Sequence, residues 1–190
     1  MRNLTLTLIL SIFFFGCEHS HEHSHESSNL EQEELYNYDI EDRIAEKGIV
    51  LPELSAPVAN YVHAVRTGNL VFLAGKGPTK PEGGYISGKV GADLTVEQGY
   101  EAAKLVAAAQ LAALKLEIGD LNKVVRVVKV LGMVNCTPDF GNQPEVINGF
   151  SDTIVEVFGD RGKHARAAVG MGSLPRNIAV EIEMIVEVRD

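Results

Sequence analysis

Three short segments near the C-terminus set the architecture of this chain: KHARAAV at residues 163–169, SLP at 173–175 and VEIEM at 180–184. The first and third segments are predicted to be strands joined by a loop. Arg166 lies at the start of the first strand, and Glu181 lies inside the otherwise apolar second strand. Burying either charge alone costs several kcal/mol, so such groups normally have a partner or a ligand. Since an arginine fork grips a carboxylate through two hydrogen bonds, we expect the rest of the fold to bring this pair into a site.

The composition fits one globular domain with an appendage. The 190 residues are 45% hydrophobic and 23% charged, which supplies enough apolar side chains for a core. The net charge is −9, and no run of Lys or Arg is interleaved with aromatic residues. The sequence therefore lacks a basic footprint for nucleic acid, and we expect no nucleic-acid partner.

The first 16 residues have the layout of a bacterial export signal. Arg2 is followed by an apolar run at residues 4–15, which is shorter than an ordinary transmembrane helix. The run ends in FFGC at residues 14–17, and a small residue directly before a cysteine resembles a lipobox. We predict a lipoprotein signal peptide at residues 1–16 and acylation of Cys17, which would anchor the exported chain to a bacterial membrane, facing the periplasm or the cell surface. The alternative is an ordinary signal peptide with an incidental cysteine.

Residues 17–38 are predicted to be a disordered tether, because this stretch is rich in His, Glu and Ser and poor in apolar residues. Its four alternating histidines, at residues 19–25, could bind a transition metal loosely. A stable site needs fixed ligands with supporting contacts, which a flexible tract does not provide. We therefore expect a solvated spacer and no specific metal site.

The remaining residues, 39–190, are predicted to form one α+β domain. Helices are expected at 39–47, at 95–118, where Thr95 and Gln98 form a capping box, and at 144–158, where Pro144 suits a first turn. Strands are expected at 61–66, 70–74, 85–90 and 124–134 and in the two C-terminal segments. The run at 70–74 is apolar throughout, which predicts burial on both of its faces.

This order of elements predicts a mixed sheet with the two main helices packed on one face. The 95–118 helix is rich in alanine, which allows its backbone to approach the sheet closely. The other face of the sheet must then be buried by something else. Self-association of the chain is the simplest candidate.

Six short motifs carry a further signal. They are APVANY at 56–61, VRTGNL at 65–70, GKVG at 88–91, VING at 146–149, KHAR at 163–166 and VEIE at 180–183. Taken together, they resemble the RidA/YjgF family, in the branch labelled endoribonuclease L-PSP or chorismate mutase-like. The resemblance runs from about residue 40 to residue 188. It implies a chorismate-mutase-like fold assembled as a homotrimer, with a ligand cleft at each subunit interface.

The resemblance also implies an activity and a set of site residues. Active members of the family hydrolyse a 2-imino or 2-enamino acid to a 2-oxo acid and ammonia, without a metal or an organic cofactor. Arg166 matches the arginine that holds the substrate carboxylate, and Glu181 matches the acidic residue near the attacking water. The matching substrate-contacting residues are Tyr61, Gly75 and Asn148. Because an imine is already electrophilic, orientation and proton delivery can supply most of the catalysis.

The chain departs from the family pattern at two places. It has AGK at residues 74–76 where Ser-Gly-Gln is common, and RAAV at 166–169 where Arg-Ser-Cys-Val is common. Lys76 either adds a second positive charge to the site, which would favour a dianionic or larger acid, or points to solvent. We therefore count Lys76 among the candidate substrate-binding residues.

Three classes of function remain at this point. The favoured hypothesis is an imine or enamine deaminase anchored outside the cytoplasm. The alternative is a binding module of the same fold, which captures a small carboxylate without turnover or offers a surface for protein contacts. Arg166 would then be a clamp only, or a structural ion-pair partner of Glu181 or Glu183. Endoribonuclease action, which the family label suggests, is disfavoured by the acidic charge and the lack of a basic run.

Overall fold

The computed structural model describes residues 34–54 and 59–190, within one compact unit that begins at Glu34. The Tyr36 hydroxyl donates a hydrogen bond to the Val124 carbonyl at 2.6 Å, and the Tyr38 hydroxyl donates to the Val157 carbonyl at 3.1 Å. Residues 34–38, which the sequence analysis assigns to the tether, therefore pack on the domain. The predicted signal peptide, Cys17 and the histidine tract lie outside the described residues.

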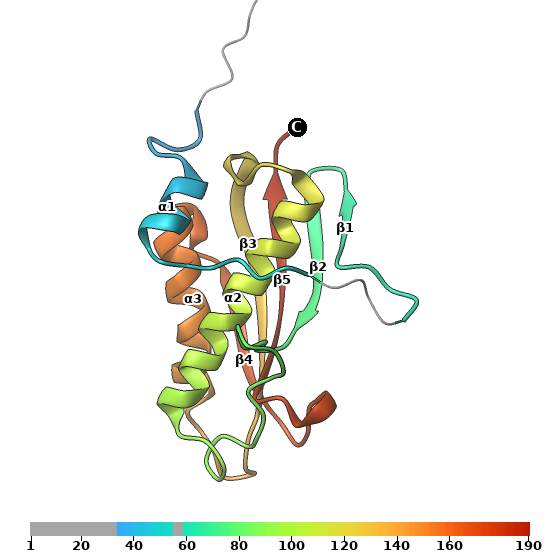
Figure 1. The fold of residues 1–190 in the computed structure, drawn as a ribbon, viewed down its shortest axis with the longest axis vertical. Helices are drawn as coiled ribbons and strands as arrows, with labels where there is room; N and C mark the ends of the chain where they lie inside the picture. Colours follow the sequence, from blue (N-terminus) through green and yellow to red (C-terminus); the bar gives the residue numbers. More distant parts are fainter. Residues whose placement is uncertain (1–33, 55–58) are drawn as a thin grey trace, which may run out of the picture. The chain divides into compact units, whose positions relative to one another are not determined.

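A mixed sheet forms the centre of the domain (Figure 1). Its strands are β1 (Ala64–Thr67), β2 (Leu70–Lys76), β3 (Val124–Asn135), β4 (Ala165–Met171) and β5 (Val180–Val188). Their spatial order is β1-β2-β5-β3-β4, and β3 and β4 run parallel while the other neighbours are antiparallel. The α-helices are α1 (Ile40–Glu46), α2 (Val96–Ile118) and α3 (Gln143–Phe158). The predicted α+β class with a mixed sheet is confirmed.

The two long helices cover one face of the sheet, as the sequence predicts (Figure 1). Along β5, burial alternates strictly: Val180, Ile182, Met184, Val186 and Val188 are buried on the helix side. The intervening residues of β5 belong to the second face of the sheet, together with their partners in the strand register. We call this second face the open face; its residues include Val65, Phe72, Leu131, Met133, Val169, Glu181, Glu183 and Ile185.

The open face is not covered within the described residues. Val65 is 56% exposed, Phe72 is 42% exposed and Val169 is 38% exposed. The prediction that the 70–74 run is buried on both faces is therefore wrong for the single chain. Val71 and Leu73 lie under the helices, whereas Phe72 lies on the open face, because one layer of helices covers only one side of the sheet.

The long helices begin as predicted. At the start of α2, the Thr95 side chain accepts a hydrogen bond from the Gln98 backbone, and the Gln98 side chain accepts one from the Thr95 backbone. The two helices approach closely where Gly149 of α3 meets α2, since a Cβ at this position would lie 2.1 Å from the Tyr100 carbonyl oxygen. Among the described residues, no helix combines the length and apolar character needed to cross a membrane.

The strand predicted at residues 85–90 does not form. This segment makes isolated bridges instead, which join Thr79 to Tyr85, Ser87 to Ile178 and Val90 to Cys136. Gly88 and Gly91 have φ values of +126° and +93°, which take the chain out of the extended conformation of a strand. The loop is held instead by Lys89, whose Nζ donates to Asn135 Oδ1 at 2.9 Å.

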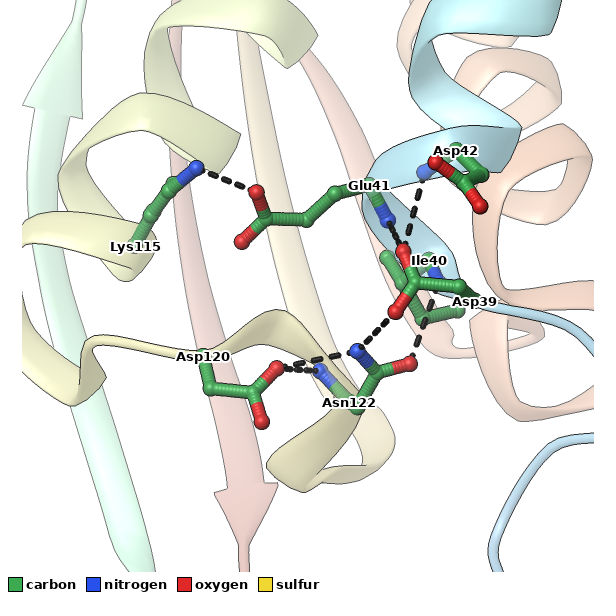
Figure 2. Close-up of polar contacts among 7 residues, drawn as sticks. All are labelled: Asp39, Ile40, Glu41, Asp42, Lys115, Asp120 and Asn122. Carbon is green, nitrogen blue, oxygen red and sulfur yellow. Dashed lines mark hydrogen bonds and ion pairs between the residues drawn. The ribbon is translucent and has the colours of Figure 1, made fainter.

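Helix α1 is joined to the domain by a polar cluster (Figure 2). Asp39 caps the helix, because its Oδ1 accepts hydrogen bonds from the backbone N–H groups of Glu41 and Asp42. Asn122, which lies just before β3, donates from Nδ2 to Asp39 Oδ2 at 2.8 Å. On the other side, Lys115 of α2 forms an ion pair with Glu41. The predicted N-terminal helix is thus confirmed and is an integral part of the domain.

Candidate functional site

Arg166 is held in place by helix α3. It lies on the edge strand β4, and its Nη1 donates to Asn148 Oδ1 at 2.9 Å and to Ser151 Oγ at 3.0 Å. No carboxylate of the described residues lies within ion-pair distance of this guanidinium, and its Nε and Nη2 groups donate to none of their atoms. Within the described residues, Arg166 therefore forms no structural ion pair with Glu181 or Glu183. The side chain is half-buried, and its hydrogen bonds within the described residues all start from Nη1.

His164 extends this arrangement into a network. Its Nδ1 lies 2.6 Å from the Gly162 carbonyl oxygen, and its Nε2 lies 3.0 Å from Ser151 Oγ. Since a carbonyl only accepts, Nδ1 carries the proton of the neutral ring, and Nε2 then accepts from the Ser151 hydroxyl. Burial lowers the pKa of His164, and the Arg166 guanidinium acts in the same direction. We call Asn148, Ser151, His164 and Arg166 the arginine cluster.

Two members of the arginine cluster, Ser151 and His164, are not among the site residues predicted from the sequence. Ser151 follows Asn148 by three positions on α3, and residues at this spacing lie on the same face of a helix. The spacing was therefore available as a signal. The position of β4 beside this face of α3 could not be predicted from the local sequence.

Glu181 occupies a different environment. It lies on the open face of β5, directly beside Gly75 of β2, where a Cβ would lie only 2.3 Å from Glu181 Oε1. Glycine at position 75 therefore leaves the space that the carboxylate fills. Burial raises the pKa of Glu181, and the neighbouring Glu183 carboxylate raises it further. The described residues provide neither an ion pair nor a hydrogen bond to the Glu181 carboxylate.

A buried glutamine fixes the irregularity in β2 that carries Gly75. The register between β2 and β5 shifts between Leu73 and Lys76. Gln110 of α2, which is fully buried, donates from Nε2 to the Ala74 carbonyl at 3.0 Å and to the Ile182 carbonyl at 2.6 Å. It thereby satisfies two carbonyl groups that a regular ladder would have paired. Gln110 was not predicted from the sequence, although a single polar residue within the apolar run VAAAQLAAL at residues 106–114 is a visible signal.

Glu181 lines a pocket of about 700 Å³. The pocket, which we call the β2–β5 pocket, is also lined by Tyr61, His63, Gly75, Lys76 and Arg176. Lys76 therefore contributes to the pocket wall instead of pointing away from it, and its Nζ lies 3.0 Å from His63 Nδ1. Burial lowers the pKa of Lys76. Arg176 has φ of +56°, a left-handed conformation that is uncommon outside glycine, and its guanidinium lies over the Tyr85 ring.

The candidate residues thus fall into two groups within one chain. Arg166 pairs in register with Val130, which is buried under the helices, so its side chain is on the helix side of the sheet. Glu181 pairs with Met133 on the open face. Strand β3 separates β4 from β5. Arg166 and Asn148 therefore lie together, the residues of the β2–β5 pocket lie together, and a single chain does not join the two groups.

Comparisons with known proteins agree with this fold. Residues 41–188 match the family model described as "YjgF/chorismate mutase-like, putative endoribonuclease". Protein TCP17 of Trypanosoma cruzi is 42% identical over 144 residues, which cover 75% of this chain and 90% of that protein. A RutC family protein of Pyrococcus abyssi is 32% identical over 142 residues, covering 75% of this chain and 97% of that protein.

A solved structure gives the same picture in three dimensions. The crystal structure of a protein of unknown function from Agrobacterium tumefaciens is 44% identical, with a TM-score of 0.72. The match covers 78% of this chain and 91% of that one. The family resemblance stated from the sequence motifs is therefore confirmed. On the family model, the sequence relatives and the fold, this chain belongs to the YjgF/RidA family.

Proposed function

We propose that this protein hydrolyses 2-imino or 2-enamino acids to 2-oxo acids and ammonia. The observation that carries the proposal is Arg166, whose guanidinium is fixed on one edge and lacks a carboxylate partner among the described residues. Such a group is ready for an anionic ligand, because a desolvated cation without a partner is unfavourable. The expected binding mode is a bidentate pair between the guanidinium and the substrate carboxylate.

Asn148 and Ser151 are proposed to orient the guanidinium. Both accept from the same nitrogen, Nη1, at 2.9 and 3.0 Å, so the plane of the guanidinium is fixed before a ligand arrives. Preorganisation of this kind lowers the entropy lost on binding. It also fixes the position of C2 of the substrate, which is the carbon that water attacks.

Glu181 is proposed to handle the proton. A carboxyl group whose pKa is raised by burial and by a neighbouring carboxylate retains or accepts a proton more readily near neutral pH than an exposed glutamate. It can hold the attacking water, take a proton from it and return a proton to the departing nitrogen. General acid–base catalysis of this kind contributes roughly 10²- to 10⁴-fold to a rate.

We propose that two copies of the chain complete each site in a homo-oligomer, and the family resemblance favours a homotrimer. Two observations support this. Arg166 and Glu181 lie on opposite sides of the sheet, and the open face exposes apolar side chains such as Phe72. Apolar faces of this kind mark interaction surfaces. A neighbour that covers the open face would bury it and could bring its own Arg166 to the β2–β5 pocket.

Complementation tests this arrangement. Arg166→Ala and Glu181→Ala proteins are each expected to be inactive. When the two are unfolded, mixed and refolded together, random pairing should restore about a quarter of the interfaces. If each site is made by one chain, the mixture will stay inactive.

The activity itself is tested with an imine-trapping assay on protein lacking residues 1–28, which leaves the compact unit intact. An amino-acid oxidase generates the 2-imino acid, and semicarbazide traps the imine that remains. We expect faster loss of trapped imine with the unmodified sequence and with Arg126→Ala, an exposed arginine on β3. Arg166→Ala should abolish the effect. If all three proteins are inert on several imino acids, the deaminase proposal fails, and the cleft is a carboxylate-binding site without turnover.

We further propose that the chain is exported and anchored through acylated Cys17. The signal layout at residues 1–17 supports this proposal. Metabolic labelling of bacterial cells with an alkyne fatty acid should mark the full chain and not the Cys17→Ser variant. Labelling that is unchanged in the variant would refute the anchor.

A further inference from the structure

Lys76 is a half-buried lysine whose partner is unusual. Its Nζ lies 3.0 Å from His63 Nδ1 in the wall of the β2–β5 pocket. Among the described residues, no carboxylate lies within ion-pair distance of this nitrogen. A lysine with an imidazole neighbour and no such counterion is stabilised less as an ammonium than an ordinary lysine.

The contact with His63 has a defined direction. An ammonium group only donates, so His63 Nδ1 accepts, and the neutral imidazole carries its proton on Nε2. His63 is therefore placed to receive a proton from Lys76, and burial of Lys76 lowers the pKa of its side chain. The other ionisable groups that line the pocket are Glu53, Tyr61, Tyr85, Arg176, Glu181 and Glu183. The carboxylates among them favour the ammonium form of Lys76, and Arg176 favours its neutral amine. The hydrogen bond of Lys76 Nζ is made to His63.

We propose that Lys76 is a nucleophile of this site, which forms a lysyl imine with C2 of the substrate, and that His63 is the base that frees its amine. This inference rests on the proposed function, whose 2-imino acid substrate is the electrophile. Both the 2-imino acid and its 2-oxo product react with amines. Lysines that are desolvated in a pocket are known to act in this way towards carbonyl compounds.

The proposed step conserves atoms and charge. The neutral Lys76 amine adds its lone pair to C2 of the 2-imino acid, which gives a geminal diamine. The original nitrogen takes a proton, for which the Glu181 carboxyl group in the pocket wall is the proposed donor, and leaves as ammonia, so that a lysyl imine remains. Water then adds to C2, and the carbinolamine collapses to the 2-oxo acid and the free Lys76 amine. The sum is imino acid plus water giving oxo acid plus ammonia, with no oxidant or reductant.

A second role for Lys76, as a clamp for the distal carboxylate of a dianionic acid, is less favoured by the pocket. Glu181 and Glu183 line the same pocket and neither has an ion-pair partner among the described residues. Two such carboxylates would repel a second negative charge on the ligand. The two roles are separable by experiment, because arginine retains the positive charge but has no amine that can be deprotonated.

The test is reductive trapping on the purified full chain in detergent at pH 7. Pyruvate and cyanoborohydride are added, and peptide mapping by mass spectrometry locates the reduced adducts. We expect Lys76 to be modified at least about tenfold faster than Lys80, a lysine that follows β2 and pairs with Glu82, because a larger fraction of the Lys76 amine is neutral. His63→Gln keeps a hydrogen-bond acceptor but cannot take the proton, so it should slow the modification of Lys76 by a similar factor.

Turnover provides the second readout. Lys76→Gln and Lys76→Arg should each lower kcat for imine hydrolysis on the order of 100-fold with little change in KM, whereas Lys80→Gln should leave both unchanged. Thermal unfolding of each variant shows whether the fold is retained. Full activity of Lys76→Gln, or activity of Lys76→Arg alone, overturns the nucleophile role.

The outcomes also separate this inference from the proposed function. If the protein deaminates imines and Lys76 is modified no faster than Lys80, the deaminase proposal stands and the lysyl imine is refuted. If no imine is deaminated and Lys76 is still modified selectively, the amine is reactive as proposed, and the deaminase proposal fails.

Discussion

Gly75→Ala is the substitution that most directly tests the placement of Glu181. The added methyl carbon would lie 2.3 Å from Glu181 Oε1, whereas ordinary contact begins at 3.4 Å. The carboxylate oxygen must therefore move by about 1.1 Å. The backbone at Gly75 does not have positive φ, so alanine is compatible with the conformation itself. The perturbation is thus confined to the space between residues 75 and 181.

The expected effects on stability and on rate differ in size. The end of a glutamate side chain can rotate away, at a cost of roughly 0.5–1.5 kcal/mol for an unfavourable rotamer. Replacing glycine also stabilises the folded state by about 0.4–1 kcal/mol, because the unfolded chain loses freedom. The free energy of unfolding should hence change by less than about 1 kcal/mol. A catalytic group displaced by about 1 Å, in contrast, lowers kcat by around 100-fold.

The assay is the imine-trapping reaction, with denaturant unfolding measured on the same preparations. Gly141→Ala is the matched control, since a Cβ at that exposed glycine would meet no atom within 4 Å. We expect kcat to fall in Gly75→Ala alone, with both variants close to wild type in stability. A Gly75→Ala protein that folds normally and keeps kcat within about threefold of wild type would show that the position of the Glu181 carboxylate is not important for the reaction.

Three further predictions follow from the site and the sheet. Ser151→Ala removes one of the two acceptors of Arg166 Nη1, so KM for the imino acid should rise roughly fivefold, which corresponds to about 1 kcal/mol of binding free energy, while kcat changes by less than about twofold. Phe72→Asp places a charge on the open face and should dissociate the oligomer in light scattering, whereas the exposed Val50→Asp should not. The pKa of Glu181 is raised on folding, so the folded state holds this proton more tightly than the unfolded chain, and stability contributed by the protonated form is lost as pH rises through the raised pKa. Glu181→Gln should therefore lose less stability than wild type between pH 4 and about pH 8 in thermal unfolding; equal losses would contradict the shift.

The parts of the fold that could be predicted are those encoded in local patterns. The alternation of VEIEMIVEV along β5 places every second residue in the core without knowledge of its neighbours. The capping box at Thr95 and Gln98 likewise involves residues only three positions apart. The strand predicted at residues 85–90 is wrong because Gly88 adopts a positive φ that only the tertiary setting reveals.

The candidate site was predictable in its residues but not in its geometry. Motif resemblance singled out Arg166 and Glu181, yet the side of the sheet on which Arg166 lies depends on the pairing of β4 with β3, which brings together distant segments. The same pairing places His164 beside Ser151 of α3. Long-range register of this kind is set by the whole hydrophobic pattern and by the helices that cover it, so no single segment contains it.

The separation of the two groups within one chain has a consequence for binding and turnover. Because Asn148 and Ser151 come from the same chain as Arg166, each chain orders its own guanidinium without help from a neighbour. Glu181, Gly75 and Lys76 are likewise brought together by β2 and β5 of one chain. In the proposed assembly, association therefore forms neither the arginine cluster nor the β2–β5 pocket. It only brings the arginine cluster of one chain to the pocket of another. A dissociated Phe72→Asp protein should then still bind a small carboxylate weakly at Arg166, as seen by the chemical shift of its guanidinium, and yet show no turnover. If it binds nothing, the clamp itself is made at the interface; if it turns over fully, the reaction does not need Arg166 and Glu181 to meet.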